Sequence, residues 1–441
     1  MAGKNIDGLV YELITSTDPA QKHQLAVEIR EMAWSKGIFL ASIDTFYKAR
    51  STGAYSGLTV PAMNLRALTY DMARAIYRVS KKRNAGAFIM EIARSEMGYT
   101  DQSPTEYAAV CLSAAIKEGY EGPVFIQGDH FQVNAKKYAA DPKKEVEGLK
   151  TLIYDAIAAG FFNIDIDSST LVDLDKPSLE EQQKLNYDIC AQMTALIRKL
   201  EPEGITVSVG GEIGEVGKEN STPEELAAFM DGFNAEASRL GIKEGLSKIS
   251  VQTGTSHGGV VLPDGTVADV AVDFDVLKKL SQISRDKYNM SGAVQHGAST
   301  LPETAFGKFP EMETAEVHLA TGFQNMIYED KEFPAKLKDE MYAWINANCA
   351  GERKSSHTDA QFIYSLRKKA LGPFKKQLWD IPEETRDKIR ASLEDKFDFL
   401  FDKLGVYDTK ELVAKYVTPV EVKVDKEPKK FSEAAEFEGD D

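Results

Sequence analysis

The stretch Pro123-Val-Phe-Ile-Gln-Gly-Asp129-His130 places a short apolar run directly before a carboxylate and an imidazole. Short apolar runs of this kind recur along the chain and alternate with longer segments of helical period. The candidate strands are Val60–Asn64, Ala87–Ala93, Pro123–Gly128, Phe162–Asp167, Thr206–Ile213, Ile249–Gly254, Gly292–His296 and Glu316–Ala320. Buried strands separated by helices predict a parallel sheet, and eight of them favour closure into a barrel. We therefore predict the α/β class and a (β/α)₈ TIM barrel over residues 59–325.

The flanks of this barrel have a different pattern. Residues 1–58 and 326–420 indicate mainly helical N-terminal and C-terminal extensions, which can cover the barrel or build an oligomer interface. Residues 421–441 are charged and poor in aromatic side chains, so we expect an acidic, disordered tail. No Gly-x-Gly-x-x-Gly pattern follows the first candidate strand, which counts against a dinucleotide-binding fold.

Composition excludes several classes of protein. The chain has 441 residues, of which 43% are hydrophobic and 28% charged, so it can bury a sizeable core. Its formal net charge of −16 argues against binding to a nucleic-acid backbone. Three scattered cysteines do not make a disulfide framework, and no stretch is typical of a signal peptide or a membrane span. We expect a cytoplasmic homo-oligomer that binds a small molecule and neither nucleic acid nor membrane.

Three of the six histidines stand at the carboxyl ends of predicted strands. His130 follows the third strand, His257 the sixth, and His296 ends the seventh. The carboxyl ends of barrel strands converge on one face, where the active site is assembled. Three imidazoles with one open position are typical of a catalytic zinc site, in which the metal acts as a Lewis acid.

Asp129 precedes His130 directly. At a strand terminus both side chains can reach the barrel mouth. Asp129 can therefore orient a metal ligand or move a proton, and the sequence leaves both roles open.

The residues after the histidines suit a bound phosphate. Gly258 and Gly297 supply backbone that can approach a ligand closely, and nearby N–H groups can cradle an anion. Ser299 lies in the second of these turns. Thr321 adds a hydroxyl at the end of strand eight, where barrel enzymes often bind phosphate.

Together these segments resemble the class II, metal-dependent ketose-bisphosphate aldolases, which act on fructose or tagatose bisphosphate. The resemblance runs from about Val60 to Phe323. It is carried by Pro61-Ala62-Met63-Asn64, Ile166-Asp167-Ser168-Ser169, Glu212-Ile213-Gly214, Gly254-Thr255-Ser256-His257-Gly258 and Gln295-His296-Gly297-Ala298-Ser299.

The resemblance implies a role for each matching residue. His130, His257 and His296 would bind Zn²⁺, and Asp129 would transfer the proton of the hydroxyl beside the breaking bond. Glu212 matches a glutamate near the metal, which can bind a second or displaced cation. The phosphate of dihydroxyacetone phosphate would lie against Gly258, Gly297, Ser299 and Thr321. The implied reaction is reversible aldol cleavage of a ketose phosphate through a metal-stabilised enediolate, as in glycolysis and related carbohydrate metabolism.

Two positions depart from the family pattern. His318 replaces a substrate-contacting asparagine on the eighth strand, and we keep it among the substrate-binding candidates. The loop after Glu212 is shorter than the family's loop, and we choose Glu219 over Glu215 as its catalytic base. Solvated glutamates are nevertheless the usual content of such loops.

Two alternatives stay open. The long flanks resemble the non-catalytic accessory subunit of tagatose-bisphosphate aldolase systems, which would hold no metal. A Schiff-base aldolase needs a lysine at the active face, whereas Lys248 stands at the start of the sixth strand, the opposite end.

Overall fold

The fold is built on one closed parallel barrel. The computed structural model describes residues 5–214, 219–254, 262–263 and 272–424. Its strands are β1 Ile38–Leu40, β2 Val60–Asn64, β3 Ile89–Ala93, β4 Gly122–Gln132, β5 Asn163–Asp167, β6 Ser208–Glu212, β7 Lys248–Val251, β8 Ala293–Gln295 and β9 Glu316–Leu319. Strands β2 to β9 pair in parallel with their neighbours in chain order, and β9 pairs with β2 to close the ring. The predicted eight-stranded barrel is confirmed.

The strand boundaries agree with the predicted runs to within one residue at most ends. The largest difference is in β4, which continues to Gln132 instead of ending at Gly128. A ninth strand, β1, was not predicted and corrects the mainly helical interpretation of residues 1–58. Its three buried residues pair in parallel with the first residues of β4, from Ile38 beside Gly122. Three residues are too few to show a strand period.

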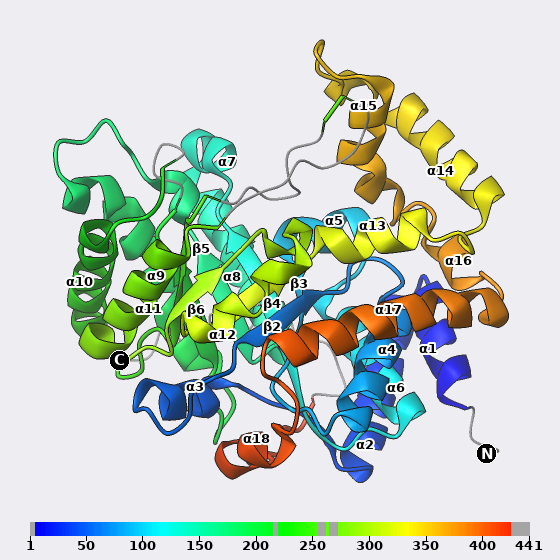
Figure 1. The fold of residues 1–441 in the computed structure, drawn as a ribbon, viewed down its shortest axis with the longest axis horizontal. Helices are drawn as coiled ribbons and strands as arrows, with labels where there is room; N and C mark the ends of the chain where they lie inside the picture. Colours follow the sequence, from blue (N-terminus) through cyan, green and yellow to red (C-terminus); the bar gives the residue numbers. More distant parts are fainter. Residues whose placement is uncertain (1–4, 215–218, 255–261, 264–271, 425–441) are drawn as a thin grey trace.

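Helices surround the barrel (Figure 1). Before and between the strands lie α1 Ile6–Thr15, α2 Pro19–Ser35, α3 Asp44–Ser51, α4 Thr69–Lys82, α5 Arg94–Thr100, α6 Pro104–Glu118, α7 Ala135–Ala140, α8 Pro142–Ala159, α9 Leu179–Leu200, α10 Pro223–Arg239, α11 Phe274–Tyr288 and α12 Lys308–Glu311. Short 3₁₀ helices lie at η1 Ser169–Leu171, η2 Ala298–Thr300 and η3 Glu303–Ala305. Among the described residues, no helix has both the length and the hydropathy to span a bilayer.

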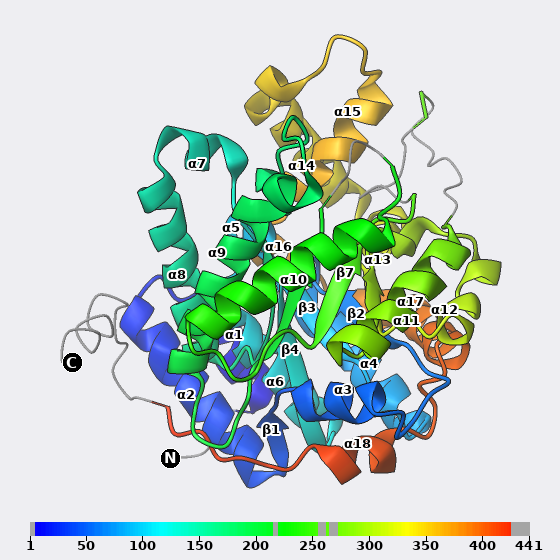
Figure 2. The ribbon, with the colours of Figure 1, turned by 90° about the vertical axis from the view of Figure 1, so that its left-hand side faces the viewer.

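The chain after the barrel is helical. It forms α13 Thr321–Glu329, α14 Ala335–Asn348, η4 Ala350–Glu352, α15 Asp359–Leu366, η5 Arg367–Ala370, α16 Lys375–Trp379, α17 Glu383–Lys403 and α18 Lys410–Tyr416. Figure 2 shows α14 and α15 at the end of the barrel that also carries α7, which follows β4, while α3 and α18 lie at the opposite end. Helix α15 therefore lies on the side of the barrel mouth. The division of the chain at residues 59, 325 and 420 stays a prediction.

Helix α17 is fastened to the barrel helix α4. Arginines of each helix pair with carboxylates of the other, including Arg74 of α4 with Glu383 of α17 at 2.9 Å. Phe401 of α17 also stacks on Phe88, which directly precedes β3, with centroids 5.5 Å apart. The C-terminal helices therefore belong to the same packed body as the barrel.

Candidate active site

Side chains from the carboxyl ends of β4 and β8 meet at the barrel mouth. Asp129 and His130 belong to β4, and His296 directly follows β8. The ring centroids of His130 and His296 are 4.4 Å apart. The potential ligand atoms of Asp129, His130 and His296 all lie within 4.8 Å of one another. All three residues line a cavity of about 640 Å³, so the structure joins residues that are far apart in the sequence.

A bulge in β4 explains why adjacent residues share one face. The pairing of β4 with β5 shifts between Gly128 and Phe131, and His130 takes a positive φ of 40°. A bulge redirects side chains that would otherwise alternate across a strand. A Cβ on Gly128 would lie 2.3 Å from the Phe131 ring, so only glycine fits there. Backbone strain of this kind is concentrated at functional sites.

His130 is held by hydrogen-bonding groups behind it. Its Nδ1 lies 2.9 Å from Oδ2 of Asp167 and 3.4 Å from Oε2 of Glu212. Gln132 donates to the same Asp167 oxygen at 2.5 Å. Such carboxylates fix the orientation of a histidine whose other nitrogen can bind a metal. On the second histidine, Nε2 of His296 lies 3.0 Å from the Ser250 hydroxyl.

The charges around His130 favour bound cations. Burial lowers the pKa of His130, but Asp129, Glu212 and the Asp167 hydrogen bond outweigh it and raise the pKa well above its usual value. Burial, followed by repulsion from Asp167, raises the pKa of Glu212 to about 7. The donor set contains imidazoles and carboxylates, the ligands that Zn²⁺ takes in catalytic sites. The described residues therefore fit a metal ion at this position.

Beneath the mouth lies a group of buried ionisable side chains that the sequence reasoning did not identify. Glu91, Asp165 and Glu316 come from β3, β5 and β9 and are at most 5% exposed. His318 joins them: Nδ1 lies 2.9 Å from Glu91 Oε2, and Nε2 lies 2.6 Å from Glu316 Oε1. Its ring centroid is 4.0 Å from that of His296. His318 thus has carboxylate neighbours on both sides, and it also lines the cavity with the other predicted substrate-binding residues Gly297, Ser299 and Thr321.

The pKa values in this group shift in different directions. Burial, then repulsion from Asp129, raises the pKa of Glu91 to about 8. Burial lowers the pKa of His318, but Glu91 and Asp129 outweigh it and raise the value well above normal. Glu91, Asp129 and His318 therefore titrate as one coupled buried group. Such closely spaced groups with perturbed pKa values are typical of active sites.

Lys248 supplies the buried positive charge of this group. Its Nζ lies 2.7 Å from Gln127 Oε1, 2.9 Å from Asp165 Oδ2 and 2.5 Å from Glu316 Oε1. A Cβ on Gly210 would lie 2.2 Å from Asp165 Oδ1, so this glycine makes room for the pair. Burial lowers the pKa of Lys248, but Asp165 and Glu316 outweigh it and raise it. A lysine held as ammonium is unsuited to Schiff-base formation, which needs the free amine.

The predicted phosphate-binding residues fall into two groups. Gly297, Ser299 and Thr321 line the cavity at the mouth. Gly297 has a positive φ of 68°, and Ser299 Oγ accepts a hydrogen bond from Gly322 N at 3.1 Å. Gly258 lies outside the described residues, as does the predicted metal ligand His257.

Glu219, which the sequence predicted as the catalytic base, does not lie with the other predicted site residues at the cavity. Glu219 is exposed and is not among the described residues that line the cavity. Glu215 lies outside the described residues. Sequence reasoning also missed four lysines and arginines that line the same cavity, among them Arg66 after β2 and Lys368 in η5.

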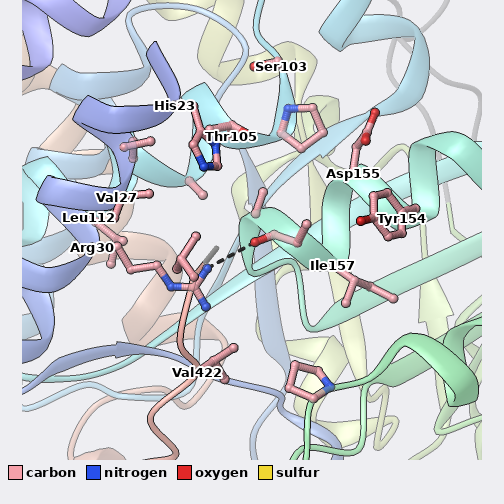
Figure 3. A pocket seen from close by; sticks show the side chains of 18 of the residues that line it. His23, Val27, Arg30, Ser103, Thr105, Leu112, Tyr154, Asp155, Ile157 and Val422 are labelled. Atoms are coloured by element: carbon pink, nitrogen blue, oxygen red, sulfur yellow. Dashed lines mark hydrogen bonds between the residues drawn. The ribbon is translucent and has the colours of Figure 1, made fainter. Parts of the chain in front are cut away.

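A second cavity of about 420 Å³ lies on the outer face of the barrel. Figure 3 shows His23 and Arg30 of α2 on one side, with Tyr154 and Asp155 of α8 on the other. Arg30 donates to the Ala158 carbonyl at 3.3 Å. No group of three potential metal ligands is found there among the described residues.

The comparisons with known proteins agree with this geometry. A family model described as fructose-bisphosphate aldolase class-II matches residues 46–374. None of the curated protein sequences matches the chain.

Solved structures share the fold at low identity. A protein from Sinorhizobium meliloti described as a probable tagatose 6 phosphate kinase has a TM-score of 0.57 at 16% identity, covering 80% of this chain and 100% of its own. A fructuronate-tagaturonate epimerase from Cohnella laeviribosi has a TM-score of 0.53 at 12% identity, covering 88% and 86%. At such identities, these likenesses establish the fold alone.

Proposed function

Because this chain belongs to the class II fructose-bisphosphate aldolase family, we propose that it is a metal-dependent aldolase that reversibly cleaves a phosphorylated ketose to dihydroxyacetone phosphate and an aldehyde. The observation that carries the proposal is the meeting of Asp129, His130 and His296 around one point at the barrel mouth. A cavity of about 640 Å³ gives a sugar phosphate room beside them.

His130 and His296 are the metal ligands that we propose from the described residues, with His257 as the third ligand predicted from the sequence. The metal, Zn²⁺ in our proposal, supplies Lewis acidity toward the substrate carbonyl when it is bound. Asp167 and Ser250 orient the two imidazoles. The chain's own residues thus fix the ligand geometry before a metal arrives.

Asp129 is the general base that we propose for the hydroxyl beside the breaking bond. It is 6% exposed and lines the cavity, so it can reach a bound substrate with little competition from water. Its Oδ1 lies 3.3 Å from Nδ1 of His318. Burial, then the charge of Asp129, raises the pKa of the neighbouring Glu91 to about 8. In our proposal Asp129 accepts the proton, and it returns this proton in the synthesis direction.

The test is an assay of aldol cleavage on fructose and tagatose bisphosphates with purified protein, before and after chelation and after Zn²⁺ is restored. We expect chelator-sensitive release of triose phosphate. Asp129→Asn should lower kcat about a hundredfold or more, with metal content unchanged. The exposed Asp175→Asn serves as the matched control. Absence of cleavage in a metal-loaded wild-type protein, with every ketose phosphate tried, would refute the proposal and favour a non-catalytic accessory subunit.

A further inference from the structure

We propose that the C-terminal segment 431–437 of this chain docks into the outer cavity between α2, α6 and α8 (Figure 3). The segment lies beyond Val424, the last described residue, so the argument uses the cavity and the amino-acid sequence. The inference is independent of the proposed aldolase activity, because no described residue lines both this cavity and the one at the barrel mouth.

The cavity has an apolar floor. Leu112 of α6 and Ile157 of α8 line it and are at most 5% exposed, and Val27 of α2 adds a third aliphatic side chain. The volume of about 420 Å³ is within the range of roughly 300–1,000 Å³ that is usual for pockets that hold organic groups. Contact between water and such apolar surface is unfavourable, so an aromatic side chain placed there would be stabilised.

A cation lies beside this floor. Arg30 of α2 reaches toward α8, where it donates to the Ala158 carbonyl at 3.3 Å (Figure 3). Burial lowers the pKa of Arg30 to about 10, and no carboxylate in the described part of the chain offsets this shift. Asp155, the carboxylate that lines the cavity, is exposed and belongs to α8 on the other side. A partly buried guanidinium without a carboxylate partner favours an incoming anion.

The chain itself leads to this place. Val422, Lys423 and Val424 line the cavity, and they are the last residues that the structure describes. Residues 425–441 follow, so 17 further residues start at the rim. An extended chain spans roughly 3.3–3.6 Å per residue. Phe431, seven residues after Val424, can therefore reach the floor of the cavity.

The tail supplies the groups that the cavity lacks. Its two aromatic side chains are Phe431 and Phe437, which enclose Ser-Glu-Ala-Ala-Glu. No lysine or arginine follows Lys430, whereas five carboxylates do: Glu433, Glu436, Glu438, Asp440 and Asp441. A phenyl ring would cover the aliphatic floor, and a glutamate beside it would pair with Arg30.

The tether favours this segment over a free ligand. It keeps the tail at an effective concentration on the order of millimolar beside the cavity. Composition predicts that residues 421–441 are disordered in isolation, but segments of this kind can order on a surface that binds them. We therefore assign the cavity to the tail of the same chain.

Hydrogen–deuterium exchange of the full-length protein tests the proposal. The double variant Phe431→Ser, Phe437→Ser keeps the length and charge of the tail but removes both rings. Peptides of α2 and of the end of α8 should exchange about threefold faster or more in this variant, because the docked tail no longer covers them. Ser432→Ala, between the two rings, is the matched control and should exchange like the wild type. Equal exchange in the double variant and the wild type would overturn the proposal.

A photo-crosslinking side chain, benzoylphenylalanine, placed at position 431 identifies the contact directly. Light should join it to peptides of α2, α6 or α8 within one chain. Crosslinks that join these peptides of two different chains would assign the cavity to the tail of a second copy and overturn the proposal. Native mass spectrometry of the wild type tests the remaining occupant. A bound small molecule, together with exchange that ignores Phe431 and Phe437, would also overturn it.

Discussion

The barrel mouth and the contact between α4 and α17 are both rich in charge, but glutamates of the two regions differ in their pKa values. At the mouth, burial and neighbouring carboxylates raise the pKa of Glu91 to about 8 and that of Glu212 to about 7. At the helix contact, burial raises the pKa of Glu383, but Arg74, Arg390 and Arg386 outweigh it and lower the pKa to about 2. Glu383 faces three arginines, whereas Glu91 and Glu212 each face another carboxylate as well as a histidine.

This difference separates a site for chemistry from a structural contact. Paired opposite charges satisfy each other and need no ligand. Like charges held together in a buried place are costly and are relieved by a proton or a metal ion. The raised pKa values of Glu91 and Glu212, together with the cavity beside them, therefore distinguish the mouth from the helix contact.

The largest expected effect is the loss of a metal ligand at the mouth. His296→Ala should remove the metal and lower kcat at least about a thousandfold, because the Lewis acid is lost. Metal content by elemental analysis and triose phosphate release would be measured together. His23→Ala, in the outer cavity of Figure 3, is the control and should change neither. Full metal content in His296→Ala would contradict the assignment of the barrel mouth as the metal-binding region, and with it the contrast to the contact between α4 and α17.

The second effect concerns the one buried lysine that compensates the carboxylates beneath the mouth. Lys248→Met leaves Asp165 and Glu316 without their ammonium. The free energy of unfolding should fall by about 3 kcal/mol, as when one partner of a buried pair is removed. Denaturant unfolding measures it, with the exposed Lys243→Met as the control. A loss no larger than that of the control would show that these carboxylates are neutral in the native state.

The smallest effect is expected at the helix contact. Glu383 is half exposed, so Glu383→Gln should cost only about 1 kcal/mol, because solvent screens its arginine pairs. The folded pKa is below the ordinary value of 4.5, so this stability is present above about pH 4.5 and is lost as the pH falls toward 2.

Thermal unfolding of wild type and Glu383→Gln at a series of pH values would show this. The two curves should differ at neutral pH and converge in acid. The neighbouring Glu384→Gln, with a side chain 88% exposed, should match the wild type throughout. A difference that persists at pH 2 would mean that the arginine pairs are not its source.

Much of the barrel was predictable because its buried strands are short apolar runs in the sequence, and polar residues follow most of these runs. Helix starts were predictable for the same local reason: Thr222 and Glu225 form a capping box, and Ser103 accepts from the amide of Glu106. Strand β1 was missed because three apolar residues carry no period.

The site was only partly predictable. His130 and His296 could be found because histidine is rare in this chain and both follow apolar runs. The bulge at His130 was not predictable, since it depends on how β4 pairs with β5. Glu91 was missed because it is a single acidic residue in an otherwise apolar strand, and Glu316 because it is the first residue of its strand. Lys368 was missed because its approach to the mouth depends on the packing of the C-terminal helices.

The central claim is that His130 and His296 bind one metal ion beside Asp129 at the barrel mouth. Crystals of the purified, zinc-loaded protein, measured at the zinc absorption edge, test it most directly. We predict an anomalous peak within coordination distance of both imidazoles and next to the Asp129 carboxylate. A zinc-loaded crystal with no peak at the mouth, and with these histidines hydrogen-bonded only to protein groups, would contradict it.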